Sequence, residues 1–470
     1  MELKHFISDV SAGAYAGRVV SSAARTKSPV DRVRYAVCLL AVVGVFYVSS
    51  VLGPSVHGDA ALIGAIGFLL LSGTLLSELI ELLGLPHLTG YLLAGVLAGP
   101  HVLNMIDAAT VRRLAPVNTL ALALIALAGG AELRLDQLRK GLRSLLVATG
   151  IHSTLGLLLG AAAFLAVRSF IPFARDLSWK AACAIALLWG VLAVSRSPSA
   201  TLGILAQTRA RGPLATFALA FVMSSDVVVI LLMALAMMFA KPLLEPGSAL
   251  SFTAFHALGH EVVGSISIGT TLGLLLAIYL RLIGRQLIVV LVALGFGASE
   301  VLHYLQFDPL LTFLVAGFVV QNLSKQGDKF LHAIEDMGAI VYVVFFASAG
   351  ADLDVPLLVD LWPIALALAA TRGAVTIAGA RASSWIAKDE LKLRAWSWAP
   401  LIAQAGLTQG LAGLVEREFP TFGAPFRALV IATLAINAII GPILFKLALD
   451  RSNEARSAIA PLSESEEATS

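Results

Sequence analysis

Long apolar runs, separated by short polar or charged stretches, set the pattern of this 470-residue chain. Examples of such apolar runs are segments 181–194, 217–240 and 289–297, which small polar residues extend. A helix needs about 20 residues of this kind to cross the hydrocarbon core of a bilayer. The alternation with period two that is typical of a membrane β-barrel is absent. The pattern therefore predicts an all-α protein that crosses the membrane many times.

Prolines, glycines and charge clusters divide the chain into about fourteen predicted helices. These cover roughly residues 33–52, 60–80, 87–103, 113–131, 142–167, 179–206, 213–240, 254–281, 284–303, 308–321, 333–350, 357–386, 394–415 and 424–449. We expect a basic cytoplasmic leader (1–32), a transmembrane domain (33–449) and a disordered cytoplasmic tail (450–470).

Composition supports the membrane assignment and narrows the chemistry. Apolar residues make up 58% of the chain and charged residues only 13%, with a mean hydropathy of +0.88. A soluble domain carries about 25% charged residues. Cys38 and Cys183 both lie in apolar runs, which excludes a disulfide framework and a cysteine metal cluster. We expect no enzyme activity, no cofactor and no nucleic-acid partner.

The basic residues are distributed unequally between the two predicted sides of the membrane. An even number of spans places both termini on one side, and that side carries about 23 of the lysines and arginines against about 8 on the other. Cytoplasmic loops carry such an excess. We therefore predict a multi-pass protein of the cell (inner) membrane with both termini in the cytoplasm.

Two short motifs recur in the same order in both halves of the chain. Tyr91-Leu-Leu-Ala-Gly95 resembles Phe313-Leu-Val-Ala-Gly317, and Ala128-Gly-Gly-Ala-Glu-Leu133 resembles Ser348-Ala-Gly-Ala-Asp-Leu353. The third and fourth spans thus match the tenth and eleventh. An offset of seven spans reverses the direction of crossing, which predicts a 7+7 inverted repeat. Such repeats are typical of secondary transporters.

A polar interruption divides the sixth span, where the chain reads Ser195-Arg-Ser-Pro-Ser-Ala-Thr201. Pro198 must kink or break the helix, and a broken backbone in the membrane has to be buried in protein or line a wet cavity. One interpretation is a proline kink satisfied by serine hydroxyls. The four hydroxyls and the arginine favour a discontinuous ion-binding helix, with Ser197, Ser199 and Thr201 as candidate ligands.

The inverted repeat predicts a matching break in the thirteenth span. Gln404-Ala-Gly-Leu-Thr-Gln-Gly410 lies there, with Thr408 as a candidate ligand. Two broken helices that cross at the midplane direct their dipoles at one point and form an ion site in many transporters. Close helix packing by small residues is the competing interpretation of this stretch.

Asp226 is the one carboxylate that the pattern places deep within a span, preceded by Ser224 and Ser225. An acid at mid-membrane depth costs at least about 2.5–3.5 kcal/mol on insertion scales, so it is a functional candidate. We expect Asp226 to bind Na⁺ or K⁺ and protons, with Ser225 beside it. The alternative is a structural ion pair with Arg196 or Arg372.

Arg196 and Arg372 also lie within spans, and two guanidiniums facing one carboxylate would favour an anion. An arginine does not readily release its proton. We expect the two arginines to compensate charge, one of them at the helix C-terminal carbonyls of the crossing. His152 is interpreted as a hydrogen-bonded packing residue.

The chain from about residue 60 to 449 resembles the monovalent cation:proton antiporter superfamily, in particular its second branch with the Kef-type proteins. The matching motifs are the Ser-Pro break, the Asp226 span, Leu88-Thr-Gly-Tyr-Leu-Leu-Ala-Gly-Val-Leu-Ala-Gly-Pro100, Leu127-Ala-Gly-Gly-Ala-Glu-Leu133 and Thr208-Arg-Ala-Arg-Gly-Pro213. The resemblance implies interleaved core and dimerisation domains, two crossed broken helices and a homodimer. It maps the ion-binding acid onto Asp226 and the basic residue of the core onto Arg372.

This chain departs from that family at Ser225, because members often carry Asp, Asn or Gln directly before the ion-binding acid. The leading hypothesis is electroneutral exchange of Na⁺ or K⁺ for protons by elevator-type alternating access. An anion or organic-acid transporter on the same fold is the second hypothesis, favoured by the two arginines. An uncoupled channel or sensor is the third. The partners expected are the cation, the proton and the lipid bilayer.

Overall fold

The computed structural model describes residues 29–52, 59–244, 253–305, 307–404 and 406–455, and every regular element in them is a helix. In chain order the helices are α3 (Pro29–Leu52), α4 (Asp59–Glu81), α5 (His87–Ala98), α6 (Ala108–Arg113), α7 (Ala115–Glu132), α8 (Leu135–Val167), η2 (Arg168–Phe170), α9 (Trp179–Val194), α10 (Pro198–Thr208), α11 (Pro213–Leu244), α12 (Thr253–Leu282), α13 (Leu287–Leu305), α14 (Pro309–Leu323), α15 (Gly327–Ala351), α16 (Val355–Ala387), α17 (Leu391–Trp396), η3 (Ala399–Leu401), α18 (Gly406–Glu418) and α19 (Gly423–Ser452).

Eight helical stretches are long and apolar enough to cross a membrane. They are Ala61–Glu81, Ala115–Glu132, Gly141–Phe170, Trp179–Thr208, Pro213–Leu244, Gly259–Leu282, Leu358–Ala387 and Gly423–Ser452. Shorter apolar helices lie among them, such as His87–Ala98 and Pro309–Leu323. The all-α, multi-span prediction is confirmed, whereas fourteen crossings remain a prediction.

The predicted ends of the transmembrane domain differ slightly from the helices. α3 begins at Pro29, four residues before the expected start. α19 continues to Ser452, and Glu454 is buried beyond it, so order extends past the expected start of the tail at residue 450. The rest of the predicted leader (1–28) and of the tail (456–470) lies outside the described residues.

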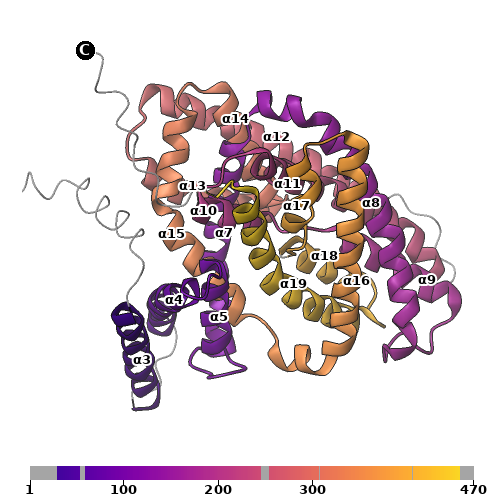
Figure 1. Cartoon of the computed structure of the whole chain (residues 1–470), viewed down its shortest axis with the longest axis horizontal. Helices are drawn as coiled ribbons and strands as arrows, with labels where there is room; N and C mark the ends of the chain where they lie inside the picture. Colours follow the sequence, from indigo (N-terminus) through magenta and orange to yellow (C-terminus); the bar gives the residue numbers. More distant parts are fainter. Residues whose placement is uncertain (1–28, 53–58, 245–252, 306, 405, 456–470) are drawn as a thin grey trace, which may run out of the picture.

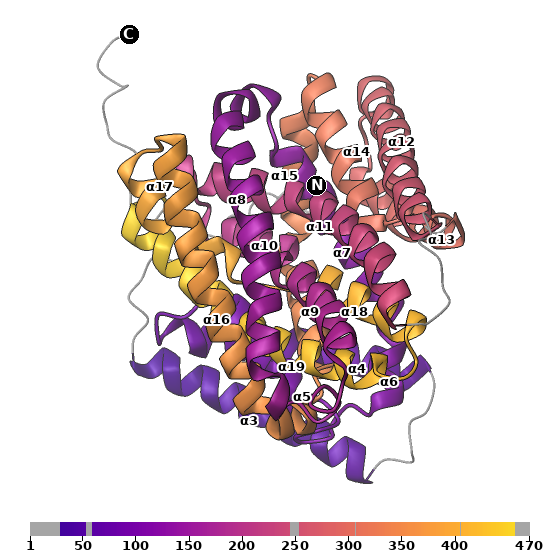
Figure 2. The ribbon, with the colours of Figure 1, turned by 90° about the vertical axis from the view of Figure 1, so that its right-hand side faces the viewer.

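The helices pack in two groups (Figures 1 and 2). In the first group, which we call the outer group, α5 packs against α4 and α15, while α14 packs against α7 and α12. In the second, the crossing group, α8 packs against α9 and α16, and α19 packs against α16 and α18. Figure 1 shows α4, α5 and α15 to one side and α8, α9 and α16 to the other.

The repeated motifs meet in reciprocal pairs within the outer group. A Cβ on Gly95 of α5 would overlap the carbonyl oxygen of Ala347 on α15, and one on Gly350 of α15 would overlap that of Leu92 on α5. Gly130 of α7 and Gly317 of α14 approach each other's helices in the same way. The motif alignment equates Gly95 with Gly317 and Gly130 with Gly350. The two close contacts are therefore related as the inverted repeat predicts, and small residues permit such backbone approach.

Candidate functional site at the helix crossing

The first interruption lies between α9 and α10. α9 ends at Val194, and α10 begins at Pro198, where a missing amide hydrogen costs no helical hydrogen bond. The Ser197 side chain caps α10, because its Oγ accepts a 3.1 Å hydrogen bond from the backbone N–H of Ala200. Thr201 Oγ1 donates to the carbonyl of Ser197 at 3.0 Å. The sequence at this position thus builds a true break with a capped second half, and not a bent continuous helix.

The hydroxyls of the first interruption lie close together. Ser197 Oγ and Ser199 Oγ are 3.3 Å apart, and both residues are buried, as is Thr201. Each hydroxyl oxygen keeps lone-pair capacity beyond these contacts. Three of the predicted ligands are therefore gathered in one turn, although their hydrogen bonds also serve the start of α10.

The second interruption lies between η3 and α18, and it meets the first. Residues 402–404 connect the two helices without helical structure, and α18 begins at Gly406. Ser195 Oγ lies 2.5 Å from Thr408 Oγ1, so one hydroxyl from each interruption forms a direct hydrogen bond. Because both side chains are buried, this bond holds the two interruptions together inside the protein. The crossing of two broken helices is as predicted.

Arg372, on α16, compensates the C-terminal ends of both half-helices. Its Nε donates to the carbonyl of Ala193 at 3.0 Å, and Nη1 donates to that of Ile402 at 2.7 Å. Its Nη2 donates to Ser195 at 2.8 Å and to Leu401 at 3.2 Å. These carbonyls have no helical partners and carry the negative end of the helix dipoles. The planar, five-donor guanidinium suits such a fork, which a lysine cannot reproduce.

Arg196 lies within the first interruption and shares two of the same carbonyls. Its Nη1 donates to Ala193 at 3.2 Å and to Ser195 at 3.0 Å. The side chain is only 2% exposed, and its Nε is buried without a hydrogen-bond partner. Two guanidiniums therefore compete for one set of helix-end carbonyls.

An amide network, which the sequence did not indicate, links the crossing to α19. Gln404 Nε2 donates to the carbonyl of Leu192 at 2.8 Å, and Asn437 Nδ2 donates to Gln404 Oε1 at 2.8 Å. The inverted repeat relates the fourteenth span to the seventh and places the counterpart of Asp226 near Asn437. This correspondence was the one signal for Asn437 in the sequence. In the second half of the molecule, a buried amide that hydrogen-bonds to Gln404 thus takes the place of the acid.

Asp226 has a different environment from its counterpart. It is 6% exposed on α11, and neither carboxylate oxygen has a hydrogen-bond partner. Among the described residues, Arg196 and Arg372 donate to carbonyls and form no ion pair with it. Ser225 Oγ donates to the carbonyl of Val222 at 2.8 Å. The structure therefore does not contain the ion pair between Asp226 and an arginine that the alternative interpretation required.

The face of α11 that carries Asp226 points towards the boundary between the two helix groups. Ile230, one turn further along, packs with Val262 of α12 and Leu311 of α14, and Leu407 of α18 borders the same cluster. Asp308, the N-cap of α14, interacts electrostatically with Asp226. Asp308 is the first residue of the predicted span 308–321, and the sequence pattern did not single it out.

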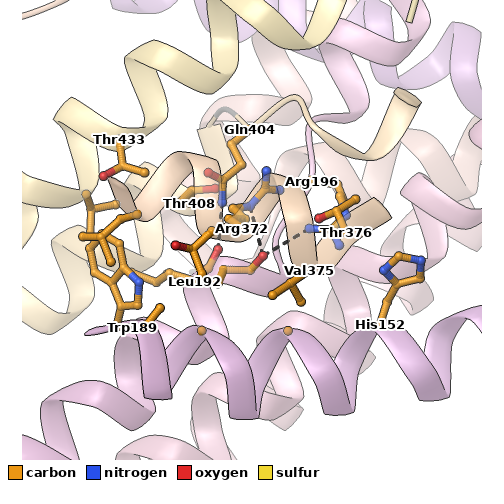
Figure 3. Close-up of a pocket in the computed structure, with 17 residues that line it drawn as sticks. His152, Trp189, Leu192, Arg196, Arg372, Val375, Thr376, Gln404, Thr408 and Thr433 are labelled. Atoms are coloured by element: carbon orange, nitrogen blue, oxygen red, sulfur yellow. Dashed lines mark hydrogen bonds between the residues drawn. The ribbon is translucent and has the colours of Figure 1, made fainter. Parts of the chain in front are cut away.

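A cavity of about 30 Å³ lies on another side of the crossing, against α8 and α16 (Figure 3). Arg196, Arg372, Gln404 and Thr408 line it, together with His152, whose ring is tilted against Phe221 at 5.4 Å between centroids. His152 is a packing residue as predicted, but its Nε2 has no hydrogen-bond partner. Asp226 is not part of the lining. The arginines and the acid thus belong to different surroundings.

Comparison with known proteins identifies the family. The family of transmembrane sodium/hydrogen exchangers matches residues 66–450. The chain belongs to the sodium/hydrogen exchanger family. It is therefore a multi-pass membrane protein and a secondary transporter, and not an enzyme. Membership supports cation:proton antiport as its activity.

Solved structures share the fold of this exchanger. The sodium proton antiporter MjNhaP1 from Methanocaldococcus jannaschii, solved at pH 8, is 16% identical with a TM-score of 0.63, over 84% of this chain and 99% of that one. An electron-microscopy structure of MjNhaP1 gives 18% identity and a TM-score of 0.66, over 85% and 100% of the two chains. A search of curated proteins found no significant match.

Proposed function

We propose that this exchanger moves a monovalent cation, Na⁺ or K⁺, against protons, and that Asp226 binds each in turn. The observation that carries the proposal is the buried Asp226 carboxylate with two unpartnered oxygens. A buried carboxylate of this kind is costly unless a proton or a cation neutralises it. Competition between the two for one carboxylate couples their movements.

A cation bound at Asp226 would also need neutral oxygen ligands. Ser197, Ser199, Thr201 and Thr408 are buried at the crossing, and Ser225 precedes the acid on α11. Hydroxyl and carbonyl oxygens suit Na⁺ and K⁺ alike. We propose these residues as the remainder of the binding site, with the cation drawing Asp226 towards the crossing.

The exchange is proposed to be electroneutral and of the elevator type. Arg372 and Arg196 keep their charges throughout the cycle, because a guanidinium holds its proton. The charge of Asp226 is then the variable one at the crossing, and one proton or one monovalent cation cancels it. The division into two helix groups supports movement of the crossing group past the outer group. We further propose a homodimer in the cell (inner) membrane with cytoplasmic termini.

Transport by purified protein in liposomes tests the proposal. A pH-sensitive dye inside the vesicles should report proton movement when Na⁺ or K⁺ is added outside. Asp226→Asn should abolish this signal and leave a folded protein, since asparagine keeps the shape but cannot exchange a proton for a cation. Asp176→Asn, at an exposed carboxylate paired with Arg175, is the matched control and should exchange normally. Normal exchange by Asp226→Asn would refute the proposal.

An anion or organic-acid cargo is the second candidate function, and one observation favours it. Two buried guanidiniums line the cavity of Figure 3, which no acidic side chain of the described residues lines. Carboxylate uptake by the same liposomes, with no response to Na⁺ or K⁺, would support this candidate. Cation flux without proton countertransport would instead support an uncoupled channel.

A further inference from the structure

The cavity beside the crossing has a charge that the protein around it does not balance. Arg196 and Arg372 are 2% and 6% exposed, and both line the cavity. Isolated buried charges are strongly unfavourable unless they are paired. Among the described residues, no carboxylate forms an ion pair with either guanidinium, and none lines the cavity.

Helix-end carbonyls compensate part of this charge, but no more than about one positive charge. The C-terminus of α9 carries roughly half a negative charge, and the three-residue η3 adds only the partial charges of its free carbonyls. Arg372 uses four carbonyls from the two ends, and the two carbonyls that Arg196 uses, those of Ala193 and Ser195, are among them. One positive charge is therefore left over at Arg196.

Unsatisfied polar atoms surround the same space. Arg196 Nε and His152 Nε2 are both buried without a hydrogen-bond partner, and both residues line the cavity. A buried N–H left without a partner costs about 1–3 kcal/mol, and more when the group is charged. Thr376 of α16 places a hydroxyl in the lining, and Trp189 of α9 closes another wall. The lining therefore combines hydrogen-bonding groups and positive charge with an apolar wall.

The size of the cavity limits what can balance the charge. About 10–15 Å³ holds one water molecule, so about 30 Å³ holds an occupant of roughly two to three water volumes. α8 lies tightly on α9 here, since a Cβ on Gly156 or Gly160 would press on Val194 or Ala193. A sugar acid or a larger organic anion does not fit without moving these helices.

We infer that the cavity between α8, α16 and the crossing is a resident site for a small monovalent inorganic anion of chloride size, held by Arg196 with His152 and Thr376. The anion neutralises the charge that the helix ends leave uncompensated. Asp226 remains separate and free to exchange its cation and proton. The inference rests on the cavity and does not depend on the cargo proposed above.

Thermal unfolding of the purified protein in detergent tests the site. Chloride or bromide replaces gluconate at constant Na⁺ and constant ionic strength. We expect a saturable rise in unfolding temperature with chloride and bromide, and none with gluconate. Arg196→Gln should weaken the apparent halide affinity at least about tenfold, as loss of a charged hydrogen bond implies. Arg175→Gln, at an exposed arginine, is the matched control and should respond like the unchanged protein.

Two further measurements decide the result if Arg196→Gln does not fold. Thr376→Val should weaken halide binding by a smaller factor, and anomalous diffraction from bromide should place a peak beside Arg196. Absence of a saturable halide response, an undiminished response in a folded Arg196→Gln, or no bromide peak in the cavity would overturn the inference. Proton-coupled uptake of radioactive chloride into liposomes would also overturn it, because the anion would then be cargo.

Discussion

The two broken helices cross at one point, but their second halves, α10 and α18, have different neighbours. α10, the second half of the first broken helix, packs on α19 and α11 and also contacts α5, α7 and α15 of the outer group. A Cβ on Gly203 of α10 would press on Leu88 and Phe346, and Leu202 fills the space over Gly129 of α7. α18, the second half of the other broken helix, packs chiefly on α19 and α9 within its own group.

This difference shows how an inverted repeat yields two unequal sides. If both half-helices contacted the outer group equally, the site would have the same access from either face of the membrane. Here α10 contacts the outer group directly before Arg209 and Arg211, which the sequence predicts to lie on the cytoplasmic side. In the proposed cycle, we interpret this arrangement as the state closed towards that side, and movement of the crossing group would exchange the roles of α10 and α18.

The largest effect is expected at Arg372, because it serves both broken helices. Arg372→Gln removes four hydrogen bonds to helix-end carbonyls, which should lower the free energy of unfolding by about 3 kcal/mol or more. Thermal unfolding in detergent measures this change. Arg381→Gln, at an exposed position of the same helix α16, is the control and should change stability little. Equal stability of the two variants would contradict the role of Arg372 at the crossing.

Two glycines, one in each half-helix, test the unequal packing directly. Gly203→Leu should force α10 away from α5 and α15, at a cost of about 1–3 kcal/mol in the closed state, and should slow exchange. Gly413→Leu in α18 meets no atom within 4 Å at its Cβ and should be tolerated. Exchange rates and unfolding temperatures of the two variants provide the comparison. If Gly413→Leu lowered the exchange rate or the unfolding temperature more than Gly203→Leu, the packing difference between α10 and α18 would not be functional.

The hydroxyl bridge joins the two interruptions and should have a smaller effect. Ser195→Ala and Thr408→Ala should each cost about 0.5–1.5 kcal/mol, and the double variant should cost less than their sum. We also expect Ser197→Ala, Ser199→Ala, Thr201→Ala and Thr408→Ala to raise the apparent KM for the cation. Strict additivity in the double-mutant cycle would mean that the 2.5 Å contact does not couple the two helices.

The smallest effect is expected from the membrane potential. Because Asp226 is the variable charge at the crossing, a potential clamped with K⁺ and valinomycin should leave Na⁺-driven exchange nearly unchanged. If the potential does change the exchange rate, Asp308, the acid that interacts with Asp226, is the residue to examine. A clear dependence on potential that disappears in Asp308→Asn would show a second titrating carboxyl and would contradict electroneutral exchange.

Much of the architecture follows from local signals in the sequence. The apolar runs predict the helices, Pro198 predicts the first break, and the recurrence of Gly95 at Gly317 predicts the reciprocal packing of the outer group. Each of these features acts through the backbone of a few neighbouring residues. They can therefore be recognised without knowing the tertiary structure.

Long-range partners could not be predicted in the same way. The sequence led us to expect one arginine at the helix-end carbonyls, but backbone carbonyls carry no residue-specific signal, so it did not indicate which arginine or which carbonyls these would be. The contact of Gln404 with Asn437 depends on how α19 packs on the crossing. Asp308 lies at the end of a helix in the sequence and near Asp226 only through the packing of α14.

Calorimetry of Na⁺ binding to the purified protein tests the central claim most directly, namely that one carboxylate takes the proton and the cation in turn. Titrations in two buffers with different ionisation enthalpies give the number of protons released per cation bound. Where the unliganded site is protonated, we predict about one proton released per Na⁺, and neither binding nor release in Asp226→Asn. Na⁺ binding without proton release, or release that persists in Asp226→Asn, would contradict the account.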